Sequence, residues 1–329
     1  MNSGFFQQEI FKIKSFSDFE KLTLEIFRWQ AEENSVYHEY IRNLNIDTTN
    51  INAIEKIPFL PVELFKTHKV LSGDDNFEVV FTSSGTTSEN TSNHFVKDVL
   101  FYEKVFLNIF NVFYGNPEEY VILALLPSYL ERSGSSLIYM MERLIEKTNK
   151  RESGFYLDDL EKLNSTLIQL SSNKKKTILF GVTFALLDFV AKYKINFPEL
   201  IVMETGGMKG RRKEIIRDEV HEELCKGFNV ASIHSEYGMT ELLSQAYSKG
   251  HGKFKTPYWM KIIVRDPYDP LSKALYNSSG GINIIDLANI DSCAFIATQD
   301  LGKIFSDGTF EILGRFDFSD MRGCNLLVD

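Results

Sequence analysis

The chain has 329 residues, of which 43% are hydrophobic and 25% are charged, so it has the composition of an ordinary globular protein with ample material for a core. The net charge of −9 argues against nonspecific binding to nucleic acid or anionic lipid, because both need a basic surface. Three cysteines without paired spacing, and apolar runs too short to span a bilayer, predict a reduced, cytoplasmic protein without a membrane span.

The first third of the chain is predicted to be largely helical. Apolar side chains recur at helical intervals over residues 16–45, and Ser17 and Glu20 have the spacing of a capping box. An irregular, proline-containing stretch then leads to a strand-like segment at 77–81. We interpret residues 1–77 as a helical cap and lead-in.

A loop rich in serine and threonine follows that strand directly. Eight of the twelve residues 81–92 are Ser or Thr and one is Gly. Their hydroxyl and backbone N–H donors suit a polyphosphate. The loop is not a Walker loop, since no Gly-Lys-Ser/Thr follows. Taken alone, such a stretch is more often a plain connection between periodic segments.

Strand-like and helical segments alternate after the loop. Continuous apolar strands between amphipathic helices predict an α/β fold with a sheet, at least partly parallel, that is covered on both faces. Ligands bind to such sheets beyond the carboxyl ends of the strands. We expect helices at 97–112, 134–146, 157–170, 184–194 and 209–226, and strands at 120–126, 177–182, 199–204 and 229–234.

Two loops at those strand ends carry residues suited to a nucleotide. Gly206 and Gly207 would let the backbone come close to a flat or bulky group. The next such turn offers the ring of Tyr237, the hydroxyl of Thr240 and the carboxylate of Glu241, which suit a base stack, a phosphate contact and a magnesium ligand. Each loop alone is more simply read as a tight turn.

The pattern changes to short β segments beyond residue 255. We expect strands at 258–264, 282–285 and 295–297, and Asp307-Gly308 predicts a hairpin turn. The predicted division is therefore a helical cap and lead-in at 1–77, an α/β core at 78–255, a β-rich subdomain at 256–313 and a hinge-like tail at 314–329.

Several motifs, in this order, resemble the successive motifs of adenylate-forming acyl ligases. Within that superfamily, the short chain, the Ser-Ser-Gly-Thr-Thr variant and the Arg322-Gly323-Cys324 ending are most similar to the acyl-protein synthetases, the long-chain fatty acid protein ligases of bacterial bioluminescence. The motifs are Thr82-Ser83-Ser84-Gly85-Thr86-Thr87, Gly206-Gly207, Tyr237-Gly238-Met239-Thr240-Glu241, Thr298-Gln299-Asp300 and Gly314-Arg315-Phe316-Asp317.

The resemblance implies a fold like the N-terminal part of these ligases, with ATP and Mg²⁺ as cofactors. A fatty acid carboxylate would attack the α-phosphate of ATP, giving an acyl-adenylate and pyrophosphate. The implied roles are leaving-phosphate contacts from Thr82, Ser83, Ser84, Gly85, Thr86 and Thr87, an α-phosphate contact from Thr240, a magnesium ligand in Glu241, adenine contacts from Gly206, Gly207, Tyr237 and Gly238, ribose contacts from Asp300, and ribose or phosphate contacts from Arg315.

The resemblance also implies a cysteine acceptor near the carboxyl terminus. Cys324 would take the acyl group as a thioester and pass it to a reductase or acyltransferase partner, and the nearby Arg322 could favour its thiolate. An inert, buried Cys324 is the alternative. For Cys225 and Cys293 we expect buried structural roles. His94 could touch phosphate or position the loop.

The chain departs from the family pattern in two places. Ser88-Glu89-Asn90 stands where related ligases carry Gly and then Pro-Lys. The 329 residues also lead us to expect a ligase without the full carboxyl-terminal domain that supplies a catalytic lysine in this family. Either a basic group such as Lys209, Arg211 or Arg315 substitutes for that lysine, or adenylation is slow, or a partner protein contributes the missing group. A carboxylate-CoA ligase resembling the phenylacetate enzymes, and a catalytically silent nucleotide-binding scaffold, therefore stay open. The chain length of the acid is not fixed, and an aryl acid is not excluded.

Overall fold

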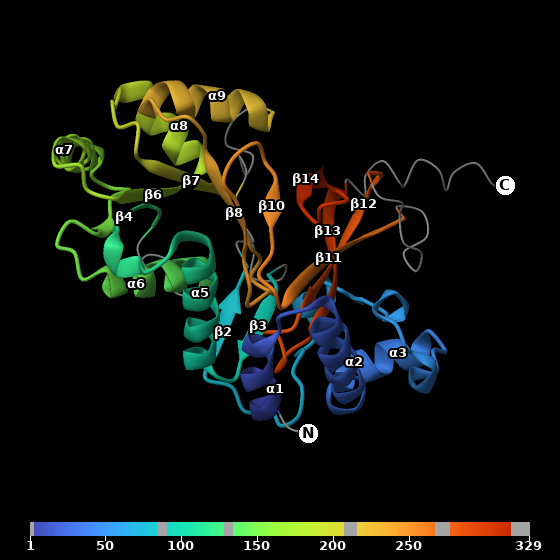
Figure 1. Ribbon diagram of the computed structural model, residues 1–329. Helices are drawn as coiled ribbons and strands as arrows, with labels where there is room; N and C mark the ends of the chain where they lie inside the picture. The colour runs from blue at the N-terminus through green and yellow to red at the C-terminus, as the bar shows by residue number, and fades with distance from the viewer. Residues whose placement is uncertain (1–2, 84–90, 128–133, 207–215, 267–276, 317–329) are drawn as a thin grey trace.

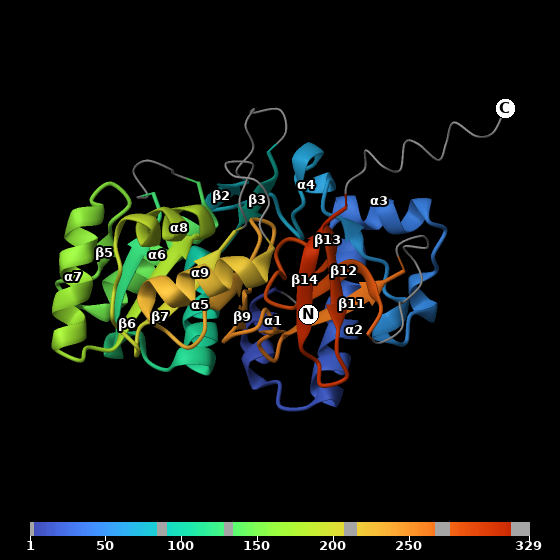
Figure 2. The same ribbon diagram turned by 90° about the horizontal axis from the view of Figure 1, so that it is seen from above.

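The computed structural model describes residues 3–83, 91–127, 134–206, 216–266 and 277–316. Most strands join one twelve-stranded sheet of order β11-β12-β13-β14-β10-β9-β8-β7-β6-β4-β5, with β1 beside β13. A separate hairpin consists of β2 (Val79–Thr82) and β3 (Asn93–Val96). Figures 1 and 2 show the sheet running the length of the molecule, with β4 to β8 at one end and β11 to β14 at the other.

The half of the sheet from β4 to β8 is parallel and covered on both faces. Alternate residues of one strand point to opposite faces, so Ile122 and Ala124 join the core under α5 and α6, whereas Leu123 and Leu125 join the core under α7, α8 and α9. The elements are β4 (Val121–Leu125), β5 (Gly154–Phe155), β6 (Thr177–Val182), β7 (Ile201–Thr205), β8 (His234–Tyr237), α5 (Val99–Tyr114), α6 (Ser136–Thr148), α7 (Leu160–Ser172), α8 (Thr183–Lys192) and α9 (Arg217–Phe228).

The other half of the sheet is antiparallel, apart from the pairing of β1 with β13. The predicted Asp307-Gly308 turn is confirmed: Gly308 has φ +82° and joins the last two strands. The strands are β9 (Ala246–Ser248), β10 (Phe254–Lys255), β11 (Met260–Arg265), β12 (Ser279–Asp286), β13 (Phe295–Ile304) and β14 (Phe310–Arg315).

The N-terminal helices pack against the antiparallel half. The expected continuous helix at 16–45 was wrong: it breaks at Asn34, whose backbone is extended and whose side chain accepts from Tyr37 N to start the next helix. The capping box is formed by Ser15 and Asp18, not by the predicted pair. The elements are α1 (Ser3–Glu9), α2 (Phe16–Glu33), α3 (Ser35–Asn43), β1 (Leu60–Pro61) and α4 (Leu64–Thr67), with 3-10 turns at Ile10–Lys12, Thr48–Asn50, Ile54–Lys56 and Pro117–Glu119.

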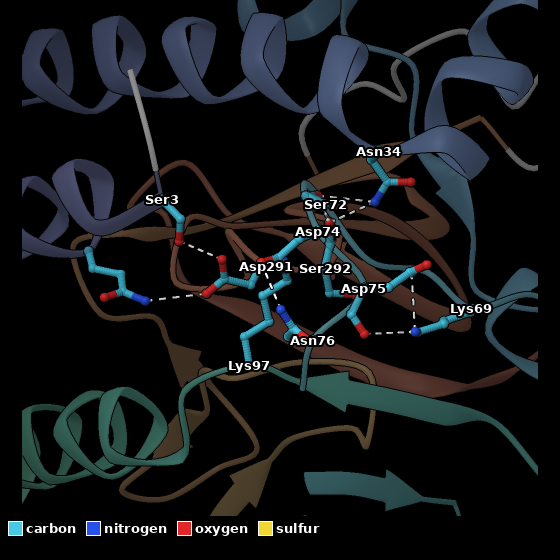
Figure 3. Close-up of polar contacts among 11 residues, drawn as sticks. Ser3, Asn34, Lys69, Ser72, Asp74, Asp75, Asn76, Lys97, Asp291 and Ser292 are labelled. Carbon is cyan, nitrogen blue, oxygen red and sulfur yellow. Dashed lines mark hydrogen bonds and ion pairs between the residues drawn. The ribbon is translucent and has the colours of Figure 1, made fainter. Parts of the chain in front are cut away.

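Polar contacts fasten this N-terminal part to the segment between β12 and β13. Ser3 donates to Asp291, and Asn34 and Ser72 both donate to the carbonyl of Ser292, at 2.9 and 2.6 Å (Figure 3). Since β1 also pairs with β13, residues 1–77 share a hydrophobic core with the rest of the chain. The domain limits stay a prediction.

Most predicted elements are present with ends shifted by at most three residues. The helix expected at 209–226 begins at Arg217, the strand expected at 295–297 runs on to Ile304, and the last parallel strand was misplaced. Asn229 adopts a left-handed conformation (φ 54°) that caps α9, and Val230 N still bonds to Cys225 O. The strand therefore begins at His234 instead of ending there, and it includes Tyr237. Across the described residues, no helix is long and apolar enough to cross a membrane.

Candidate active site

The Ser/Thr-rich loop connects β2 to β3, and the structure describes its base. Ser83 and Ser92 close this base, because Ser83 N donates to Ser92 O at 3.1 Å and Ser92 N donates to Ser83 Oγ at 2.9 Å. Thr82 N donates to the carbonyl of Gly134 at 2.7 Å. The predicted phosphate contacts Ser84, Gly85, Thr86 and Thr87 lie outside the described residues.

Two buried side chains contact the backbone carbonyls of the turn that carries Thr240 and Glu241. The ring of His94 lies 2.7 Å from Thr240 O through Nδ1 and 3.0 Å from Asn289 Oδ1 through Nε2. Asn289 Nδ2 donates to Glu241 O at 2.7 Å. Burial lowers the pKa of His94 to about 4, against the effect of these contacts. His94 thus contacts the backbone of the Thr240 turn and the side chain of Asn289, and its expected part in phosphate binding or in positioning the Ser/Thr-rich loop stays a prediction.

The end of the same turn is anchored on Asp286, which sequence reasoning missed. This carboxylate is fully buried and accepts from Leu243 N at 3.0 Å and from Ser244 N at 2.9 Å. Burial raises its pKa, although these hydrogen bonds oppose the rise. Asn289 was missed as well. No local signal in the sequence marks either residue, because their role depends on which turn they reach across the sheet.

Glu241 is the predicted magnesium ligand, and its side chain is almost completely buried. Burial raises its pKa, while a hydrogen bond with Ser92 acts in the opposite direction. Ser92 closes the base of the β2–β3 loop, so Glu241 lies beside the predicted phosphate site. No cluster of three or more metal-binding side chains occurs among the described residues. A single carboxylate still fits Mg²⁺, which is usually held by one or two carboxylates together with substrate phosphates.

Tyr237, Asp300 and Arg315 meet across three strands. Tyr237 Oη donates to Asp300 Oδ2 at 2.7 Å, and Arg315 Nε donates to Asp300 Oδ1 at 3.0 Å. Asp300 is 5% exposed, whereas the Arg315 side chain is 72% exposed and faces solvent. Asp300 lies within β13 instead of following it, opposite Arg315 of β14. Three residues with predicted nucleotide contacts thus form one hydrogen-bonded group.

Gly206 lies at the carboxyl end of β7, with φ +58°. Thr183 Oγ1, at the start of α8, lies 3.1 Å from Gly206 O and 2.8 Å from Glu204 Oε2. Burial raises the pKa of Glu204. The nearby His221 and the positive charge of Arg217 lower it by more, so the pKa of Glu204 lies below the ordinary value. The ionised Glu204 and Thr183 hold this strand end in place. Gly207 lies outside the described residues.

The two cysteines that the structure describes, Cys225 and Cys293, differ in how deeply they are buried. Cys293 is fully buried, and burial raises the pKa of its thiol to about 12, so it is inert at neutral pH, as expected. Cys225 on α9 is only partly buried, so its expected buried position was wrong, although it packs against the core and burial still raises the pKa of its thiol. Cys324 lies outside the described residues, as do the candidate bases Lys209 and Arg211.

Solved structures share this arrangement of strands and helices. An open conformation of 2-hydroxyisobutyryl-CoA ligase, in complex with 2-HIB-AMP and CoA, matches with a TM-score of 0.64 and 12% identity over 92% of this chain and 70% of that one. ATP-bound MatB from Rhodopseudomonas palustris matches with a TM-score of 0.53 and 17% identity over 72% of this chain and 47% of that one. The chain therefore has the fold of the matched N-terminal part of these ligases.

One curated relative adds a local sequence match to this ligase fold. The long-chain-fatty-acid–luciferin-component ligase of Photorhabdus luminescens is 37% identical over 67 residues, which are 20% of this chain and 57% of that relative. No protein-family model matches the chain. The resemblance predicted from the motifs is confirmed by these similarities, although the chain spans little more than half of that relative and 47% of MatB.

Proposed function

We propose that the protein activates a carboxylic acid with ATP to an acyl-adenylate and then transfers the acyl group to a thiol. The observation that carries this proposal is the convergence of Tyr237, Asp300 and Arg315 at the carboxyl side of the parallel strands. Ligands bind at this edge in open α/β sheets. The ligase fold and the fatty-acid name of the curated relative support the same reaction class.

Adenylation is a displacement at phosphorus. A carboxylate oxygen of the acid bonds to the α-phosphorus of ATP, the bond to the bridging oxygen breaks, and pyrophosphate leaves with the electron pair. Positioning and charge stabilisation provide most of the catalysis in such transfers. Thr240 contacts the α-phosphate, and Asp300 accepts hydrogen bonds from the ribose hydroxyls. Arg315 is exposed enough to reach ribose or phosphate.

Glu241 is the residue that would hold Mg²⁺. The ion, when bound, neutralises charge on the phosphates. His94 and Asn289 fix the backbone of the Thr240–Glu241 turn. The side chains of Thr240 and Glu241 therefore start the reaction already positioned. Gly206 and Gly238 would let the backbone approach the adenine beside Tyr237. The division into a core at 78–255 and a β-rich part at 256–313 stays part of this proposal.

The acyl acceptor in this proposal is the thiol of Cys324. Its thiolate bonds to the acyl carbon, AMP leaves with its phosphate oxygen, and a thioester results. The curated relative's name supports a fatty acid as the substrate. Cys293 is too deeply buried for this step. A reductase or acyltransferase that accepts the acyl group from the thioester would be the partner protein.

A CoA ligase is the second candidate, and one observation favours it. The structure of 2-hydroxyisobutyryl-CoA ligase, which was solved with CoA, matches 92% of this chain. In this reading, adenylation is unchanged and free CoA replaces Cys324 as the acceptor. A silent nucleotide-binding scaffold would bind ATP without releasing pyrophosphate.

The acceptor is tested by incubating the protein with ATP, Mg²⁺ and labelled fatty and aryl acids, and by measuring label on the denatured protein. We expect hydroxylamine-labile label that disappears in Cys324→Ser, while Cys293→Ala keeps it. Label that persists in Cys324→Ser would refute this acceptor. Pyrophosphate release with no label, together with acyl-CoA formation, would identify the CoA ligase.

A further inference from the structure

The motif at 298–300 forms a bulge in the sheet, and Asp300 is its last residue. The register of β12 and β13 shifts between Gly281 and Asn283. At this shift, one residue of β12, Ile282, lies opposite the three residues of the motif on β13. Bulges interrupt the ladder of hydrogen bonds and change the direction of side chains, often beside active sites. The shape of this bulge therefore decides where the Asp300 carboxylate points.

A single guanidinium group, that of Arg265, bonds to both strands at the bulge. Arg265 lies in β11 and is paired with Gly281 of β12, and its side chain crosses β12 to reach β13. Nη1 donates to Ile282 O and to Asn283 Oδ1, both at 2.8 Å. Nη2 donates to Thr298 O at 2.6 Å. Because the guanidinium is planar and rigid, these bonds fix the two strands relative to each other.

Thr298 connects this guanidinium to Asp300. The Thr298 side chain is buried, and its hydroxyl donates to Ile282 O at 2.9 Å. The same hydroxyl oxygen accepts from Asp300 N at 3.1 Å. Arg265 therefore holds the carbonyl of Thr298, while the hydroxyl of Thr298 holds the backbone of Asp300. A displacement of the guanidinium reaches Asp300 through this one residue.

Gly281 leaves the space that the guanidinium occupies. A Cβ built at Gly281 would lie 2.5 Å from Arg265 Cζ and 2.7 Å from Arg265 Nε. Real Cβ atoms do not come that close to another heavy atom, so a side chain here would displace the guanidinium. The displacement breaks hydrogen bonds, because three of them hold the group in place. A glycine within a strand often marks such a bulge or close approach.

The position is costly for a charged side chain. Burial lowers the pKa of Arg265, although the charges of Glu63 and Asp300 act in the opposite direction. A buried guanidinium is stable only when acceptors occupy its donors. Three acceptors do so here, and two of them are carbonyls of the bulge. The buried charge and the shape of the bulge therefore depend on each other.

We propose that Arg265, in the space left by Gly281, positions the Asp300 carboxylate for the ribose of ATP. The Asp300 side chain itself bonds to Tyr237 and Arg315, so Arg265 is a positioning residue that acts on the backbone next to it. This inference rests on the proposed ribose contact of Asp300. Loss of the guanidinium changes the bulge and moves the carboxylate away from the ribose hydroxyls, whereas the phosphate contacts on the other strands stay in place.

ATP and its dideoxy analogue provide the test, because the analogue lacks both ribose hydroxyls. We measure kcat/KM for pyrophosphate release with each nucleotide, using an acid that the natural protein accepts. The natural protein should prefer ATP by roughly 10- to 100-fold, which is the effect of hydrogen bonds to a charged group. Arg265→Met should lose most of that preference through a higher KM for ATP. Its kcat/KM with the dideoxy nucleotide, which also reports on correct folding, should change by less than about twofold.

Two more variants separate the geometry of the guanidinium from its charge. Gly281→Ala displaces the group but keeps its charge, and Arg265→Lys keeps a charge but lacks the planar fork that reaches three acceptors. Both should lose the preference for ATP. Arg143→Met is the matched control, because Arg143 is also partly buried but pairs with Glu142 and Glu146 on α6. It should keep the preference.

The inference is overturned if Arg265→Met slows both nucleotides equally, since the residue then has only a structural role. Full preference for ATP in Arg265→Lys would also overturn it, because charge alone would be sufficient. A natural protein that does not distinguish the two nucleotides would remove the ribose role of Asp300 and the inference with it. If no acid supports pyrophosphate release, the proposed adenylation fails. Calorimetric binding of the two nucleotides then decides the inference, since Arg265→Met must weaken the binding of ATP alone.

Discussion

The hydrogen bond between Tyr237 and Asp300 should couple the parallel and antiparallel halves of the sheet energetically. Tyr237 lies in β8, and Asp300 lies in β13, which is four strands away in the sheet order. The 2.7 Å bond has a buried carboxylate as its acceptor. Hydrogen bonds to charged groups contribute about 1.5–3 kcal/mol. The Arg315 side chain is 72% exposed, so its ion pair adds only about 0–1 kcal/mol.

A double-mutant cycle measures this coupling. Tyr237→Phe, Asp300→Ala and the double variant are unfolded in urea, with far-ultraviolet circular dichroism as the signal. We expect a coupling free energy of about 1.5–3 kcal/mol between the two sites. Asp300→Ala should also raise the KM for ATP, because Arg315 loses its anchor. Tyr120→Phe, whose hydroxyl donates to Tyr114 O, is a control for the loss of a tyrosine hydroxyl. Coupling below about 0.5 kcal/mol would refute the reasoning.

Three further predictions follow from other residues of the site. Asn289→Ala should cost about 2–5 kcal/mol of unfolding free energy and slow adenylation, because the carbonyls of Glu241 and Cys293 both lose a buried donor; a stability loss without any rate change would show that the turn does not need this anchor. The raised pKa of Glu236, about 7, means that the folded state holds this proton more tightly than the unfolded state, so its contribution is complete below pH 4.5 and is lost as the pH rises through 7. Urea unfolding at pH 5 and pH 8 should show this loss, up to about 3 kcal/mol, in the natural protein, and a flatter pH profile in Glu236→Gln; identical profiles would contradict it. In Gly238→Ala the new Cβ would lie 2.5 Å from Glu236 Oε1, so the Glu236 side chain must shift beside the turn and we expect slower adenylation; a rate equal to that of the natural protein would show that this shift does not disturb the turn.

The sequence predicted the parts of the fold that depend on local pattern. The apolar run at β4 and the alternation with amphipathic helices led to the covered parallel sheet, and Asp307-Gly308 marked the hairpin between β13 and β14 in the antiparallel half. The break at Asn34 was missed because the apolar spacing continues through it, while a side-chain cap decides the backbone. The start of β8 was missed because Val230 and Ile233 look like strand residues, although the left-handed Asn229 ends α9 just before them.

Some residues of the candidate site stand in sequence motifs, whereas others are recognised only from the structure. Tyr237 and Asp300 belong to separate sequence motifs, and the structure brings their side chains within hydrogen-bonding distance, while Thr240 follows Tyr237 in the next turn. Their nucleotide contacts stay a prediction. Asp286 and Asn289 were missed because their importance depends on which turn they reach across the sheet, and a single sequence does not show long-range register.

Acid-dependent exchange of labelled pyrophosphate into ATP tests the central claim most directly, because it requires a reversible acyl-adenylate and no acceptor. We predict exchange that needs both Mg²⁺ and an acid and that falls at least about tenfold in Asp300→Ala. Glu241→Gln should lose most of the magnesium-dependent rate. ATP binding without exchange, across fatty, hydroxy, amino and aryl acids, would contradict adenylation and favour a silent nucleotide-binding protein.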